Sequence, residues 1–174
     1  GYARDITGLT GALVAKAMQK GVKFDEITHV CRDIDPLRYS NSRLIGRMAY
    51  KAYQDAKTIA YEAKSIQKID ESNPPIRLKN FKRDAVYMAQ LEKAYAMLDP
   101  KLQHIPFHAG EIHLINLAAL EFSEGDFNKA IEFVVNYGRD NDTVAAVTGA
   151  SLGAYHGFNK LPKDLREKVL KTNK

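Results

Sequence analysis

The sequence lacks the features that mark several protein classes. It has one cysteine, Cys31, in 174 residues, so no internal disulfide can form, and it has no tryptophan. No apolar run approaches the roughly 20 residues of a membrane-spanning helix, and no cationic segment followed by an apolar one indicates a signal peptide. A single cysteine beside Val30 fits a buried thiol in a reducing compartment. We therefore expect a soluble, cytoplasmic protein without a membrane partner.

The excess of positive charge is modest. There are 26 Lys and Arg residues against 21 Asp and Glu residues, a formal net charge of +5. The basic residues gather in "RLKNFKR" (Arg77 to Arg83) and in the tail from Lys160 to Lys174. A nucleic-acid-binding surface would combine such charge with aromatic side chains or a helix that contacts the bases. Phe81 is the only aromatic residue in the first cluster. A solvated surface explains the charge better, so we expect no nucleic-acid partner.

The hydrophobic pattern predicts an all-α fold. Apolar residues recur three and four positions apart, whereas alternation over five or more residues is nearly absent. A chain of this length, 45% hydrophobic, can build the core of one compact multi-helix domain. We expect helices over about 6–20, 24–34, 42–68, 81–98 and 111–122, one between Asp126 and Gly138, one headed by Asp140 and one near Pro162. Residues 70–80, "DESNPPIRLKN", are the predicted linker, because two prolines interrupt any helix there.

One segment, "GRDNDTVAAVTGASLGAYHG" (residues 138–157), places two acids one residue apart at the head of a helix rich in Ala, Gly, Val and Thr. Such a helix body is typical of close packing, and Gly149 and Gly153 indicate the approach of another backbone. The head of the helix would then lie inside the protein. Two carboxylates buried there would be costly unless a cation or hydrogen-bond donors compensate.

The acids and the hydroxyl at this head favour two interpretations. Asp140, Asp142 and Thr143 offer the oxygen ligands that Mg²⁺ and Mn²⁺ prefer, whereas capping a helix needs only one such residue. An EF-hand is excluded by the spacing. Counted from Asp140, the sixth position is Ala145 where glycine is needed, and the twelfth is Ser151 where glutamate is needed. Spacing alone leaves metal binding and simple capping open.

The segment from Ala130 to Pro162 resembles the C-terminal signature of the ADP-ribosylglycohydrolase family, which includes dinitrogenase reductase-activating glycohydrolases and certain crystallins. In that signature an apolar helix leads to Gly-Gly-Asp-x-Asp-Thr, a small-residue helix ending in Gly-Ala-x-x-Gly, and a Leu-Pro. The resemblance implies hydrolysis of an N- or O-glycosidic bond that joins ADP-ribose to a protein or small molecule. It implies a dinuclear Mg²⁺ or Mn²⁺ centre with Asp140, Asp142 and Thr143 as ligands, the two aspartates being catalytic through the metal.

The sequence departs from the family pattern in two ways. Arg139 replaces the second glycine, and we expect Arg139 and Asn141 to contact the ADP-ribose substrate. The family's Thr/Ser-Asp-Asp element and glycine-rich segment are absent, so we expect residues 1–174 to be the C-terminal portion of a longer domain, sharing its metal centre with residues outside the chain. The alternative is a catalytically inactive scaffold, either a crystallin-like structural protein or an ADP-ribose-binding relative.

Other polar residues favour structural roles. His104, His108 and His113 have the spacing of zinc ligands, but Pro106 interrupts the helix that would align the first two, and no cysteine joins them. We expect loop and surface histidines. Glu111 is interpreted as a first-turn acid of a buried helix, favoured there by the helix dipole.

Overall fold

The computed structural model describes residues 2–33, 48–69 and 84–172. Within these ranges the chain forms eight α-helices and no strand, which confirms the all-α prediction. The predicted linker at 70–80, the basic cluster at 77–83 and the predicted start of a helix at residue 42 lie outside the described residues.

The helix bounds differ from the predicted ones by a few residues. The helices are α1 (Tyr2–Ala17), α2 (Phe24–Asp33), α3 (Met48–Lys64), α4 (Ala85–Leu98), α5 (Ala109–Ser123), α6 (Phe127–Tyr137), α7 (Asn141–His156) and α8 (Lys163–Thr172). Two short 3₁₀ turns, η2 (Asp99–Lys101) and η3 (Phe158–Lys160), follow α4 and α7. The Asp84 carboxylate accepts a hydrogen bond from the backbone N–H of Tyr87 at 3.0 Å, so α4 begins after Asp84 and not at residue 81.

The buried side chains follow the helical periodicity of the sequence. On α1 the buried residues stand three or four positions apart and form one stripe: Ile6, Leu9, Leu13 and Ala17. On α3 they are small and branched residues together with a tyrosine: Ala52, Tyr53, Ala56, Ile59, Ala60 and Ala63. Each stripe faces the shared core and leaves the charged faces in water.

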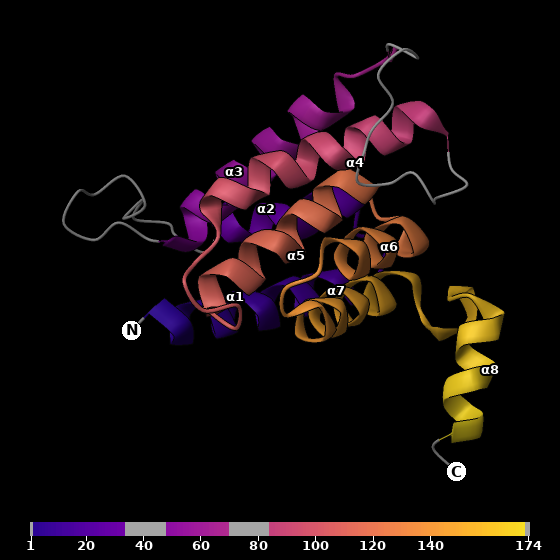
Figure 1. The fold of residues 1–174 in the computed structure, drawn as a ribbon. Coiled ribbons are helices and arrows are strands. Elements are labelled where there is room, and N and C mark those ends of the chain that lie inside the picture. Colours follow the sequence, from indigo (N-terminus) through magenta and orange to yellow (C-terminus); the bar gives the residue numbers. More distant parts are fainter. Residues whose placement is uncertain (1, 34–47, 70–83, 173–174) are drawn as a thin grey trace.

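The central element is α5, which is apolar nearly all round. Nearly all its residues from Gly110 to Ser123 are buried, as expected for a helix covered on several sides. It packs against α1, α3, α6 and α7. Figure 1 shows α5 between α3 and α4 on one side and α1 and α7 on the other. The side chain of a residue near the start of α5 can therefore contact residues of the helices on either side of α5.

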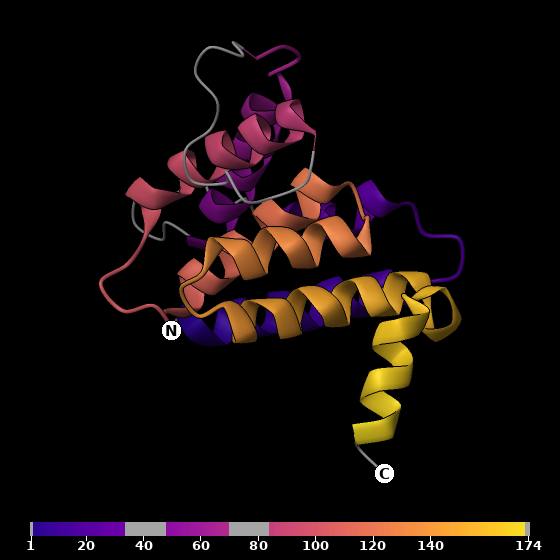
Figure 2. The same cartoon turned by 45° about the vertical axis from the view of Figure 1, so that its right-hand side comes forward.

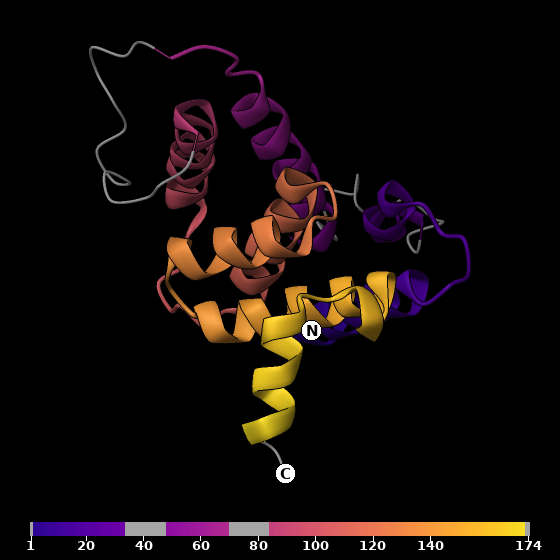
Figure 3. The same ribbon diagram turned by 90° about the vertical axis from the view of Figure 1, so that its right-hand side faces the viewer.

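Helix α7 lies beside α1, and the two run in similar directions (Figure 2). It also packs against α5 and α6. Helix α8 projects away from the other helices (Figures 1 and 3), and its Leu165, Val169 and Leu170 are exposed. In the ranges that the structure describes, every helix is too short or too polar to cross a membrane.

Candidate metal centre

The site begins at the turn between α6 and α7. Gly138 has φ 89° and Arg139 has φ 60°, so two successive residues have positive φ before Asp140 occupies the N-cap position of α7. Glycine adopts such angles without penalty, whereas a residue with a Cβ does so rarely. The glycine that the family signature has at position 139 suits this backbone, and Arg139 takes it at a conformational cost.

Asp140, Asp142 and Thr143 come together at the head of α7. Asp140 makes no side-chain capping bond to the backbone, and its Oδ1 instead accepts a hydrogen bond from the Thr143 hydroxyl at 2.9 Å. A side-chain interaction with Asp140, followed by the backbone N–H groups of Thr143 and Asp142, holds the pKa of Asp142 below its usual value. The three predicted ligands thus share one place in the fold.

This donor set fits part of a hard-cation site. Two carboxylates in contact repel each other unless a proton or a cation lies between them. The positive end of the α7 dipole stabilises the ionised carboxylates, and carboxylate and hydroxyl oxygens suit Mg²⁺ and Mn²⁺. However, no group of three or more His, Cys, Asp or Glu residues in the described ranges could hold a metal ion. The described residues alone therefore do not make a complete metal site.

The prediction that the head of α7 lies inside the protein is wrong. Asp142 and Thr143 are exposed, and Asp140 is half-buried. In the described part of the chain, the buried residues of α7, which include Val144 and Thr148, lie on the face that packs against the neighbouring helices. The first turn of α7, with Asp142 and Thr143, follows a turn at the surface. The carboxylates therefore face solvent and do not carry the desolvation cost of burial.

The glycines of α7 do not mark the approach of another described backbone. A Cβ at Gly149 would meet the Ile131 side chain at 3.8 Å, and one at Gly153 would meet the Leu161 side chain at 4.0 Å. Both distances are ordinary van der Waals contacts. The expectation of close backbone packing at these glycines is wrong for the described part of the chain.

Arg139 and Asn141 have partners within the protein. The Arg139 Nε donates to Glu111 Oε1 at 2.8 Å, and its Nη2 donates to Glu111 Oε2 at 3.0 Å and to the Gln103 carbonyl at 2.8 Å. The Asn141 amide donates to the Val135 carbonyl at 3.2 Å. The Glu111 carboxylate raises the pKa of Arg139. The expected contacts of Arg139 and Asn141 with substrate stay a prediction.

Sequence reasoning missed the role of Glu111. Its side chain is fully buried, yet it was interpreted only as a dipole acid. Two signals pointed to a partner: an acid in the first turn of an otherwise apolar helix, and an arginine at a position where the family signature has glycine. A buried carboxylate needs a compensating charge, and Arg139 is that charge.

The histidines also depart in part from expectation. The His108 Nδ1 accepts a hydrogen bond from the Gly110 N–H at 3.1 Å, so His108 is the N-cap of α5. His104 is exposed, as predicted. His113 is only 1% exposed, so the expectation of a surface histidine is wrong there. It lies on the central helix, which its neighbours cover, and burial lowers its pKa to about 4.

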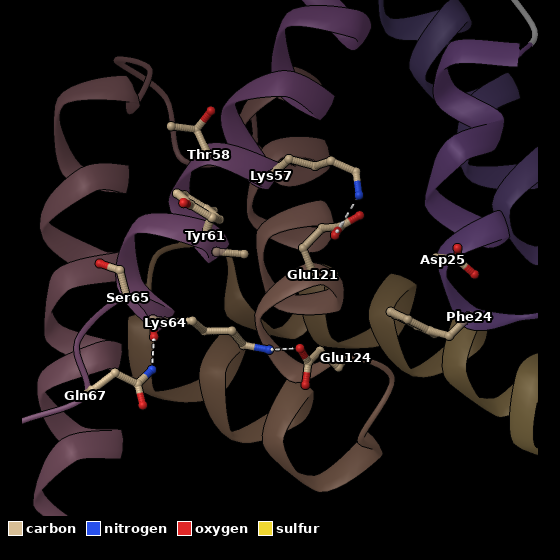
Figure 4. A pocket seen from close by; sticks show the side chains of 11 residues that line it. Phe24, Asp25, Lys57, Thr58, Tyr61, Lys64, Ser65, Gln67, Glu121 and Glu124 are labelled. Carbon is tan, nitrogen blue, oxygen red and sulfur yellow. Dashed lines mark hydrogen bonds and ion pairs between the residues drawn. The ribbon is translucent and has the colours of Figure 1, made fainter.

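A separate hollow of about 900 Å³ lies between the start of α2, the second half of α3 and the end of α5 (Figure 4). Across it, Lys57 pairs with Glu121 at 3.2 Å and Lys64 pairs with Glu124 at 2.7 Å. Glu111 stands in the first turn of α5 and Glu121 in its last, about 15 Å of helix apart. This hollow is therefore distinct from the aspartate cluster.

Fold and site together define an all-helical protein with paired aspartates and a threonine at the head of a small-residue helix. A sequence profile of the ADP-ribosylglycohydrolase family matches residues 3–174. The chain therefore belongs to the ADP-ribosylglycohydrolase family. Searches of curated proteins and of solved structures gave no match to the chain.

Proposed function

We propose that this chain supplies Asp140, Asp142 and Thr143 to a dinuclear Mg²⁺ or Mn²⁺ centre that serves hydrolysis of an ADP-ribosyl group from a protein or small molecule. Family membership supports a glycohydrolase-type hydrolase. The observation that carries the finer proposal is the hydrogen bond from the Thr143 hydroxyl to the Asp140 carboxylate, with a second carboxylate, Asp142, in the same first turn of α7.

Each of the three side chains has a role in the proposed centre. The Asp142 carboxylate, like any exposed aspartate, is ionised at neutral pH, so it can bind a cation without first losing a proton. The Thr143 hydroxyl orients the Asp140 carboxylate through its hydrogen bond. Paired divalent ions, when bound, orient substrate hydroxyls and lower the pKa of a bound water.

The coordination shell needs further donors. Mg²⁺ takes about six oxygen ligands, and two carboxylates and one hydroxyl leave places for water and for other residues. We propose that these residues belong to a segment outside this sequence, the chain being the C-terminal portion of a longer glycohydrolase-like domain. The exposure of Asp142 and Thr143 leaves this face open to such a segment.

A second candidate is a non-catalytic relative, either an ADP-ribose-binding protein or a crystallin-like scaffold. It is favoured because no group of three or more His, Cys, Asp or Glu residues in the described ranges could hold a metal ion. Substrate hydrolysis and substrate binding are measured separately, so the two candidates can be told apart.

The test is release of ADP-ribose. The full-length protein is incubated with Mn²⁺ or Mg²⁺ and with proteins that carry N-linked or O-linked ADP-ribose, and the product is separated by chromatography. We expect release that is lost in Asp140→Asn/Asp142→Asn. The matched control is Asp126→Asn, an acid-to-amide change at the N-cap of α6, where asparagine caps equally well. Binding of ADP-ribose without release would favour the second candidate, and neither binding nor release would contradict both ligand-based proposals.

A further inference from the structure

Glu111 and Arg139 form a clamp beside the aspartate cluster. The Glu111 side chain is fully buried, and each of its two oxygens accepts a hydrogen bond from the Arg139 guanidinium. The Gln103 backbone N–H also donates to Glu111 Oε2 at 2.7 Å, and Arg139 in turn donates to the Gln103 carbonyl. The Glu111–Arg139 clamp therefore joins three segments: the loop before α5, the first turn of α5 and the turn between α6 and α7.

The geometry of the clamp restricts both the position and the orientation of the Arg139 guanidinium. An arginine that meets a carboxylate through two parallel N–H groups fixes orientation as well as distance. A buried carboxylate that loses its partner is strongly unfavourable, so the pair resists opening. Arg139 is consequently held in place by a partner on the most buried helix of the fold.

The restraint reaches the aspartates through the backbone. Arg139 has φ 60°, a conformation that residues with a Cβ adopt rarely, and it is bonded directly to Asp140. Without a compensating interaction, the free energy of the chain would fall if Arg139 left this conformation. The ion pair to Glu111 supplies that compensation, and the turn that presents Asp140 and Asp142 keeps its shape.

We propose that Glu111 and Arg139 are positioning residues for the proposed metal centre: their bidentate ion pair holds the α6–α7 turn in the shape that presents Asp140 and Asp142. The inference rests on the proposed function. In this assignment Arg139 acts through the backbone of its own turn, and its guanidinium contacts Glu111 rather than the substrate.

The probe is Mn²⁺ alone, titrated calorimetrically into the full-length protein without substrate. The informative variant is Arg139→Lys, which keeps the positive charge and loses the bidentate geometry. We expect Mn²⁺ affinity to fall about tenfold, the size typical of changes to partners that orient metal ligands. Arg32→Lys is the matched control, because Arg32 is exposed and, among the described residues, forms its ion pair with its neighbour Asp33; the Mn²⁺ affinity of this variant should not change.

A merely structural clamp would behave differently. It would lower the melting temperature of Arg139→Lys and leave the Mn²⁺ affinity of the folded protein unchanged, so titration is performed well below the melting transition of every variant. Glu111→Gln should weaken Mn²⁺ binding in the same direction. If Glu111→Gln does not fold, Arg139→Lys and Arg139→Gln, which change a partly exposed side chain, still decide the question.

Asp140→Asn/Asp142→Asn separates the two proposals. Loss of Mn²⁺ binding in this variant together with the tenfold loss in Arg139→Lys supports the clamp. Loss in the aspartate variant with unchanged affinity in Arg139→Lys overturns the clamp and leaves the metal site standing. Unchanged affinity in the aspartate variant overturns the metal site and the clamp together.

Discussion

The Thr148 hydroxyl on α7 donates a hydrogen bond to the Asn116 Oδ1 on α5 at 2.8 Å, and both side chains are buried. This bond ties the helix that carries the aspartate cluster to the central helix. Thr148→Val keeps the shape of the side chain and removes the donor, so the buried Asn116 oxygen loses its partner. We expect the free energy of unfolding to fall by about 1–3 kcal/mol.

Urea denaturation measures the effect of Thr148→Val. The control is Thr58→Val, because the Thr58 hydroxyl on α3 is exposed and bonds only to the Gln54 carbonyl of its own helix. That change should stay within about 0.5 kcal/mol. A Thr148→Val/Asn116→Leu double variant should be less destabilised than the sum of the two single changes, because it leaves no buried polar group unpaired. Strict additivity would show that the two side chains do not interact in solution.

Stability should depend on pH through His113. Burial lowers the pKa of His113 to about 4, against about 6.5 in an unfolded chain. Between these two pH values the unfolded state binds more protons than the folded state. The contribution of neutral, buried His113 to the free energy of unfolding is therefore fully present above about pH 6.5 and is lost as the pH falls toward 4. The two pKa values set the total loss at about 3 kcal/mol.

Thermal unfolding at a series of pH values measures this dependence. We expect His113→Leu to flatten the curve between pH 6.5 and pH 4. His104→Leu, at an exposed loop position, should keep the slope of the parent protein. Equal slopes in His113→Leu and the parent would mean that His113 is not buried as neutral imidazole.

Cys31 should be inert in the folded protein. It is 3% exposed, and burial, with a smaller contribution from the Glu121 charge, raises the pKa of its thiol to about 12. Since the thiolate is the reactive form, labelling by a thiol reagent at pH 8 should proceed only through unfolding. Cys31 is the only cysteine in the chain, so mass spectrometry gives one unambiguous site. Rapid labelling of the native protein would contradict the buried position.

Periodicity was enough to predict the helices. The stripe of Ile6, Leu9 and Leu13 could be read directly, because burial of one face requires steps of three and four residues. The end of α7 at Gly157, which has φ 75°, follows from the same local rules. The mostly apolar character of "EIHLINLAALEF" (residues 111–122) indicated a central helix, and α5 occupies that place.

Side-chain direction was harder to predict. Sequence spacing places Asp140 and Asp142 near each other, but it does not tell which face of α7 the neighbouring helices cover. Asp142 proved exposed and Asp140 half-buried, although the helix behind them is rich in small residues. The pairing of Glu111 with Arg139 joins residues 28 positions apart and depends on how α5 and α6 pack, which local patterns do not specify.

The most direct test of the account is calorimetric titration of Mn²⁺ into this chain and into the full-length protein, with Asp140→Asn/Asp142→Asn as the comparison and Asp126→Asn as the control. The account predicts weak binding by a partial site, tighter binding where the remaining ligands are present, and loss of binding only in the Asp140/Asp142 variant. Absence of Mn²⁺ binding in both unmodified forms, or equal binding in the Asp140/Asp142 variant, would contradict it.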